Sequence, residues 1–195
     1  MKPILLHPRI TQLHRLMRSL SDEFPLVEGF RRVAPKGNPA AAHILLLSAT
    51  PSEEEAQGME AFSGDVGDLL TVALERAGIP VRCCYLTHAI PFLLKRHPSF
   101  EELMTMRPLL VRLIDAINPE GVVALGKEAL AVLLGKPIQS WEDAQGGKQK
   151  VKGFNAPVYG TLHPRYVLKS GGIDRSNGQQ LIEDLRRVSH DTTPF

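Results

Sequence analysis

The sequence predicts an α/β fold, a three-layer α/β/α arrangement around a central four-stranded parallel sheet. Four short apolar runs of strand length alternate with segments whose apolar residues recur at helical spacing. The first run, residues 44–47, is apolar throughout, which is typical of a strand buried on both faces. Strands that alternate with helices usually form a parallel sheet between two helical layers, and we expect that architecture here.

The first half of the chain is predicted to contain two strands and three helices. Apolar residues at helical spacing indicate a helix over residues 9–20, and an irregular link with three prolines then leads to the first strand at 43–47. A second helix is expected over 65–77, closed by Gly78, and a second strand over 81–87. A third helix begins at Ser99 and extends toward Ile117, with Pro108 as an expected kink or break.

The second half repeats the alternation. We expect the third strand and its turn at 121–126, a short helix at 127–134, the fourth strand at 156–162 and the last helix at 176–188. Residues 141–152 are polar and contain glycine, so they are predicted to form an exposed loop or a hairpin.

Composition indicates one globular domain over residues 1–195. The chain is 43% hydrophobic with a formal net charge of +2, and no stretch approaches the ~18–20 apolar residues of a membrane span. Its two cysteines, Cys83 and Cys84, are adjacent, so we expect no disulfide between them. We expect them to be buried thiols in a reducing cytoplasm. Both ends of the chain are net positive, a pattern that permits contact with a phosphate backbone.

Three strand ends are expected to meet at one edge of this sheet. They are the small-residue turn at 48–52, Thr87 with His88, and the segment 162–165. Ligands of open parallel sheets bind beyond the carboxyl ends of the strands, so this edge is the candidate site. Three glutamates and an isolated aromatic, Phe62, follow the first of these turns, although a solvated acidic loop with Phe62 in the core explains them equally well.

Four motifs at these positions resemble the uracil-DNA glycosylase superfamily, particularly its family 4, the thermostable iron–sulfur type. They are Ser48-Ala-Thr-Pro-Ser-Glu-Glu-Glu55, Phe62-Ser-Gly64, Tyr85-Leu-Thr-His88 and Thr161-Leu-His-Pro164. Their order and spacing match the family from about residue 13 to residue 188. The resemblance implies a uracil-DNA glycosylase-like fold and a flipped nucleotide held at the candidate site.

The resemblance also implies catalytic roles for His163 and Glu55. A glycosylase needs a donor for the oxygen of the departing base, which His163 matches, and Glu55 matches the residue that activates water or stabilises the cationic sugar. The alternative for His163 is an ordinary turn residue before proline. The alternative for Glu55 is a solvated side chain, since any of the three glutamates can be solvated.

Base binding is implied for Ala49, Thr50, Phe62 and His88. Phe62 supplies a stacking face, and His88 replaces the asparagine with which the family reads the base edge. Thr50 stands where some superfamily members carry a catalytic aspartate and cannot act as a base near neutral pH. The implied DNA contacts are Arg165, Tyr166, Lys169 and Ser170, after the His-Pro turn.

The iron–sulfur cluster of family 4 is not expected here. The four positions of its cysteine ligands correspond to Ser21, Phe24, Phe92 and Met106, and such a cluster requires thiolates. We therefore expect no metal and no cofactor.

The leading hypothesis is a monofunctional DNA glycosylase that releases uracil or a related modified pyrimidine from DNA. The partner would be duplex or single-stranded DNA with a flipped base, the protein would be a cytoplasmic monomer, and no membrane would be involved. Because Ala49, Ser52 and His88 depart from the family pattern, two alternatives remain open. One is a glycosylase-fold protein that binds DNA or a partner with impaired catalysis, and the other is a glycosylase for a hypermodified base.

Overall fold

The computed structural model describes residues 8–29 and 32–192 and confirms the α/β architecture. Its strands are β1 (Ile44–Ser48), β2 (Cys84–His88), β3 (Gly121–Leu125), β4 (Lys148–Gln149) and β5 (Val158–Thr161). Its α-helices are α1 (Pro8–Ser19), α2 (Glu53–Gly58), α3 (Asp65–Arg76), α4 (Phe100–Ile117), α5 (Lys127–Leu134), α6 (Trp141–Ala144), α7 (Pro164–Lys169) and α8 (Ser176–Asp191). Short 3₁₀ turns cover Ser21–Glu23, Pro39–Ala41 and Val81–Cys83.

The sheet has the strand order β2-β1-β3-β5-β4. Four of these strands are parallel, as the sequence predicts, and β4 adds a two-residue antiparallel pairing to β5 at the edge. β4 belongs to the segment for which a loop or hairpin was expected. The chain runs outward from β1 to β2 and then returns to β3 on the other side of β1, so the order reverses between β1 and β3. Ligand sites of open α/β sheets lie beside such a reversal.

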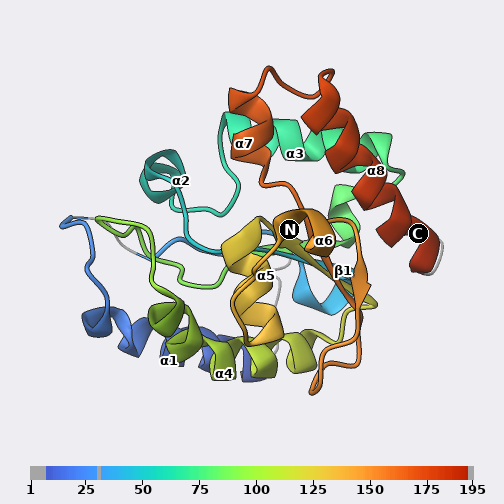
Figure 1. Ribbon diagram of the computed structural model, residues 1–195. Helices are drawn as coiled ribbons and strands as arrows, with labels where there is room; N and C mark the ends of the chain where they lie inside the picture. Colours follow the sequence, from blue (N-terminus) through green and yellow to red (C-terminus); the bar gives the residue numbers. More distant parts are fainter. Residues whose placement is uncertain (1–7, 30–31, 193–195) are drawn as a thin grey trace, which may run out of the picture.

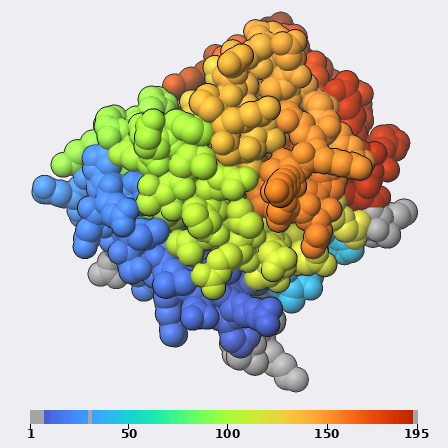
Figure 2. All heavy atoms as spheres, turned by 60° about the horizontal axis from the view of Figure 1, so that its bottom comes forward, coloured from blue at the N-terminus to red at the C-terminus, as the bar shows by residue number. Residues whose placement is uncertain are grey.

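Helices cover both faces of the sheet (Figure 1). Leu45 and Leu47 of β1 join the core shared with α1, α4 and α5, whereas Ile44 and Leu46 join the core shared with α3, α7 and α8. Figure 2 shows the first of these layers from outside, with α1 in blue beside α4 in green. Burial on both faces explains why the β1 segment is apolar without alternation.

Two local expectations were wrong. β2 begins at Cys84, not at residue 81, because Cys83 N donates to Pro80 O and forms a 3₁₀ turn. α4 runs through Pro108, so the break expected there is absent, while a kink at Pro108 stays a prediction. Pro108 lies on the exposed side of α4, and Leu103, Met106 and Leu110 hold the other side in the core.

Two helices next to the site were not expected. α2 forms in the acidic segment because Ser52 and Glu55 make a reciprocal capping box at its start. α7 starts directly after His163, with Pro164 in the first helical position, where the missing N–H of proline costs nothing.

Within the described ranges, no helix is long and apolar enough to cross a membrane. The prediction of one domain over residues 1–195 extends to residues outside those ranges and stays a prediction.

Candidate active site

The carboxyl ends of β1 and β2 lie side by side, with Ser48 in register with His88. The backbone carbonyls of Ser48 and Ala49 then accept hydrogen bonds from Ala89 N and Ile90 N, at 2.8 and 2.9 Å. The turn that carries Ala49 and Thr50 is thus fixed against the end of β2, and both residues are half-buried. The structure places both residues at the edge of the sheet that the sequence indicated.

His163 reaches the same edge from the end of β5. It is the N-cap residue of α7, and its Nδ1 atom accepts a hydrogen bond of 3.0 Å from Arg165 N. Because Nδ1 is an acceptor, the ring proton is assigned to Nε2. Nε2 lies 3.2 Å from the Ser48 hydroxyl oxygen. The Ser48 hydroxyl in turn donates to the Thr50 carbonyl oxygen at 3.3 Å. The local helix start therefore fixes both the tautomer of His163 and the direction in which it donates.

His163 is neutral at physiological pH. Burial, and next the positive charge of Arg165, lower its pKa from 6.5 to about 4, although the carboxylate of Glu55 opposes the shift. A neutral imidazole with its proton on Nε2 is a fixed hydrogen-bond donor without a charge of its own.

Glu55 is the inward-facing member of the three glutamates, with 2% of its surface exposed. One carboxylate oxygen accepts from Ser52 N at 2.7 Å and from Ser52 Oγ at 2.9 Å, and the other accepts from Phe62 N at 2.6 Å. Burial raises the pKa of Glu55, but His88 and the two backbone donors outweigh it and lower the pKa to about 2. Glu55 is thus a buried anion, and each of its carboxylate oxygens accepts at least one hydrogen bond.

Phe62 and His88 are stacked on each other. Their ring centroids are 5.3 Å apart and their planes differ by 21°. Phe62 is 2% exposed and His88 1% exposed, so in this conformation neither ring offers a free face to solvent. His88 Nε2 lies 3.1 Å from Glu55 Oε1, but neither ring nitrogen has a hydrogen-bond partner in the described part of the chain.

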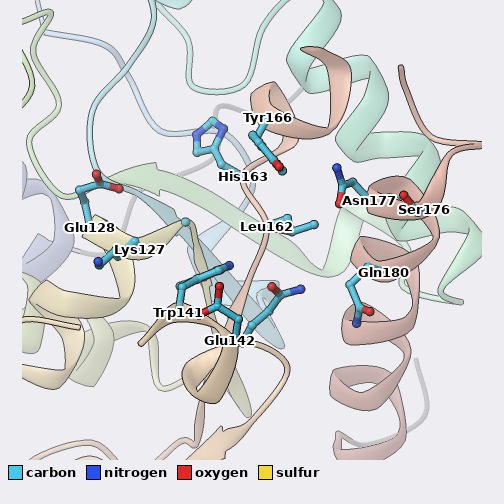
Figure 3. A pocket seen from close by; sticks show the side chains of 12 residues that line it. Lys127, Glu128, Trp141, Glu142, Leu162, His163, Tyr166, Ser176, Asn177 and Gln180 are labelled. Atoms are coloured by element: carbon cyan, nitrogen blue, oxygen red, sulfur yellow. The ribbon is translucent and has the colours of Figure 1, made fainter. Parts of the chain in front are cut away.

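His163 also lines an open cavity of about 590 Å³. Figure 3 shows that its side chains come from several elements: Lys127 and Glu128 from α5, Trp141 and Glu142 from α6, Tyr166 from α7, and Asn177 and Gln180 from α8. Two aromatic rings, several amides and three charged side chains line this cavity, and such a lining is suited to a polar, planar ligand. Trp141 and Gln180 were missed from the sequence, where a single tryptophan at the start of a polar segment was the available signal.

Comparison with known proteins accords with this geometry. The model of the uracil DNA glycosylase superfamily matches residues 34–186. The chain belongs to this superfamily.

Three similar curated proteins are type-4 uracil-DNA glycosylases. The Pyrobaculum aerophilum protein is 26% identical over 171 residues, which cover 84% of this chain and 87% of that protein. The Thermotoga maritima protein is 31% identical over 156 residues, covering 74% and 75%. The Saccharolobus solfataricus protein is 28% identical over 166 residues, covering 80% and 74%.

The DNA contacts expected from the superfamily resemblance all lie on or next to α7. Tyr166 is 55% exposed and Lys169 is exposed, so both are free to meet a ligand. The Ser170 hydroxyl donates to Val167 O at 3.0 Å, which leaves its oxygen as an acceptor rather than a free donor. The Arg165 side chain lies toward Glu55, with its Nη2 atom 4.0 Å from a Glu55 carboxylate oxygen.

The positions that correspond to the cluster cysteines of family 4 do not fit an iron–sulfur cluster. Phe24 and Phe92 pack with ring centroids 6.4 Å apart, and both share one core with Met106. Ser21 lies in a surface 3₁₀ turn, where its hydroxyl is 3.4 Å from an oxygen of Asp22. Among the described residues, no group of three or more His, Cys, Asp or Glu side chains is placed to hold a metal ion.

Proposed function

We propose that this protein is a monofunctional DNA glycosylase that hydrolyses the N-glycosidic bond of uracil or a related modified pyrimidine. The main support is the state of His163, a neutral imidazole at the carboxyl edge of the sheet. Its Nδ1 accepts from Arg165 N at the start of α7, so its Nε2–H points toward Ser48 at the end of β1. Membership in the superfamily and the type-4 names of the relatives support the same substrate class.

The chemistry follows from where charge develops. As the glycosidic bond breaks, negative charge grows on the leaving pyrimidine and positive charge grows on the sugar. His163 Nε2–H donates to the base oxygen, in place of its present contact with the Ser48 hydroxyl. Such a donor is most effective when it is fixed in advance in a site that excludes water.

The geometry of Glu55 favours an electrostatic role over water activation. Its oxygens are engaged by Ser52 and Phe62, and its low pKa makes it a weak proton acceptor. A buried carboxylate nevertheless stabilises a cationic sugar through space, because the surrounding dielectric is low.

DNA is the expected partner on the α7 side. Tyr166 and Lys169 are exposed there, next to the cavity that borders His163, and this supports a base flipped toward His163 with phosphates along α7. We further propose a monomer in the cytoplasm, where the free thiols of Cys83 and Cys84 would remain reduced.

The test is base release from defined DNA. Duplexes and single strands that carry uracil, other modified pyrimidines or hypoxanthine are incubated with the parent protein and then cleaved with alkali at abasic sites. We expect release of uracil or of a modified pyrimidine. His163→Ala should slow single-turnover release by ~10²–10³-fold while DNA affinity stays unchanged. His97→Ala, which changes an exposed histidine, is the matched control.

One observation favours a second candidate, a DNA-binding protein with impaired catalysis. The stacked Phe62–His88 pair closes the face on which the flipped base was expected to stack. If the parent protein binds all of these DNAs with equal affinity but releases no base, the second candidate replaces the first.

A further inference from the structure

A second cavity, of about 550 Å³, lies between α1, the segment 32–39 and β2. Thr11, His14, Arg15 and Arg18 of α1 line it, at positions i, i+3, i+4 and i+7, so they form one stripe along the helix. Arg32 and Tyr85 line the cavity from the opposite side. The cavity therefore brings three arginines together from two separate parts of the chain.

This cavity is distinct from the candidate active site. Tyr85 lies three residues before His88, so it is about 10 Å back along β2 from the carboxyl edge. β2 is also the edge strand, separated from β5 and His163 by β1 and β3. A nucleotide held at His163 would not place its own phosphates here.

The three arginines have no carboxylate partners in the part of the chain that the structure describes. Among the described residues, Arg15, Arg18 and Arg32 form no ion pair, and α1 contains no acidic residue. The Nε and Nη2 atoms of Arg32 are buried without a hydrogen-bond partner in the described part of the chain. Arg18 and Arg32 also line a neighbouring cavity of about 470 Å³.

The positive charge of the arginines lowers the pKa values of groups around the cavity. His14 is buried with Nε2 3.0 Å from the Tyr85 hydroxyl. Burial, and next the charges of Arg32 and Arg18, lower its pKa to about 4. Burial and the repulsion from Arg18 also lower the pKa of Arg32, although Tyr85 opposes the shift. Arg15 and Arg18 are exposed, whereas two guanidinium nitrogens of Arg32 are buried without a partner among the described residues. Burying such a cation is costly, so the retention of Arg32 beside two further arginines indicates a ligand.

The wall of the cavity is held in place before any ligand arrives. Lys36 and Leu86 exchange backbone hydrogen bonds of 2.9 Å in both directions, which fixes the segment against β2. Gly37 has φ +103°, and a Cβ there would overlap the Cys84 carbonyl oxygen, so only glycine permits this close approach. The segment that follows Arg32 is thus fixed by backbone contacts with β2, and α1 is held by Ile10, Leu13 and Met17 in the core.

We propose that this cavity binds a phosphate group, with Arg15, Arg18 and Arg32 as its ligands. Guanidinium groups bind phosphate oxygens through paired, charge-assisted hydrogen bonds, and three of them suit a dianion better than a single carboxylate. The Thr11 side chain adds a hydroxyl donor at the same surface. The phosphate belongs either to a small phosphorylated molecule or to the backbone of DNA bound elsewhere on the protein.

The first measurement is calorimetric titration with inorganic phosphate and with pyrophosphate, at an ionic strength held constant with sodium chloride. The parent protein should bind either anion at one site, and Arg32→Gln and Arg18→Gln should each weaken binding by ~10-fold or more. Arg9→Gln is the matched control, because Arg9 is an exposed α1 residue that does not line the cavity. Absence of binding, or equal weakening by the Arg9 change, would overturn the proposal.

Folding of the variants is checked without phosphate. Since Arg32 Nε and Nη2 are buried without a partner among the described residues, Arg32→Gln should leave the melting temperature equal or higher. The His14 ring provides an independent readout by NMR, because an anion in the cavity should raise its pKa. An unchanged His14 titration at saturating phosphate would place any binding elsewhere and refute the cavity site.

DNA affinity then separates the two sources of phosphate. If the source is the DNA backbone, Arg32→Gln should weaken binding of undamaged duplex while Arg9→Gln does not, and pyrophosphate should compete. If the source is a small molecule, DNA affinity should be the same for both variants and indifferent to pyrophosphate at matched ionic strength. Neither outcome depends on glycosylase activity, so the phosphate site is tested separately from the proposed function.

Discussion

The rings of His88 and Phe62 lie face to face, 5.3 Å apart, at the point where the base of a bound nucleotide was expected to stack. His88 ends β2, whereas Phe62 lies between α2 and α3 and has the left-handed backbone conformation φ +54°. Glu55 touches both, through Phe62 N and His88 Nε2. The three residues therefore form one buried unit, and a base reaches Phe62 only if His88 moves.

Replacing His88 by asparagine should increase uracil release. The shorter amide uncovers the Phe62 ring, and stacking of a base on an aromatic ring is worth ~1–3 kcal/mol, so we expect a gain of about tenfold or more. The measurement is single-turnover release from uracil-containing duplex, with His97→Asn as the control at an exposed position. Equal rates for the parent and His88→Asn would mean that His88 does not restrict the base.

Replacing Glu55 by glutamine should destabilise the fold. An amide nitrogen cannot accept from Ser52 N or Phe62 N, so at least one buried donor loses its partner. We expect a loss of ~2–4 kcal/mol in the free energy of unfolding, measured by urea denaturation. Glu53→Gln, an exposed change in the same helical turn, should stay within ~0.5 kcal/mol. Similar midpoints for the two variants would contradict the buried network.

Replacing Lys169 by alanine should weaken DNA binding equally for all sequences. Lys169 is exposed at the end of α7, and loss of one phosphate contact should reduce the slope of log affinity against log salt by about one unit. Lys95→Ala is the control, because Lys95 is exposed on the chain segment that pairs with Pro25. Affinity that is unchanged at low salt would exclude α7 from the DNA interface.

Stability should fall as the pH is lowered from about 6.5 to about 4. His14 and His163 have folded pKa values near 4, so in this range the unfolded chain binds protons that the folded chain does not. Each histidine accounts for at most about 3 kcal/mol of the loss. His14→Gln, in chloride buffer, should flatten this part of the curve of unfolding free energy against pH. An equally steep curve for the variant would show that His14 is not held neutral.

Glu55 affects stability at lower pH than the two histidines do. Its folded pKa near 2 is below the ordinary value of 4.5, so the stability it contributes above pH 4.5 is lost as the pH falls toward 2. Glu55→Gln should therefore remove acid sensitivity below pH 4.5 and leave the slope between 6.5 and 4.5 unchanged.

The purified protein should be colourless and free of iron. The positions that correspond to cluster cysteines are occupied by Ser21, Phe24, Phe92 and Met106, which offer no thiolate. Elemental analysis and the visible spectrum of anaerobically purified protein test this directly. Stoichiometric iron with a broad visible absorbance would contradict it.

The sequence alone determined the layered architecture and the edge that carries the site. The apolar run of β1 and the alternation of strands and helices reflect burial on both faces of a sheet, which is a property of each segment by itself. The start of α2 was also readable, because Ser52 and Glu55 stand at capping-box spacing, although the segment was interpreted as a loop or a binding turn. These features depend on neighbours within a few residues in the chain.

The tertiary structure decided which of these residues meet. That Glu55, rather than Glu53, is buried follows from its contacts with Phe62 and His88, which are seven and 33 positions further along the chain. In the same way, the α1 stripe becomes a basic cavity only because Arg32 and Tyr85 are packed against it. No periodicity encodes such distant pairings, since they depend on how the layers and loops pack in space.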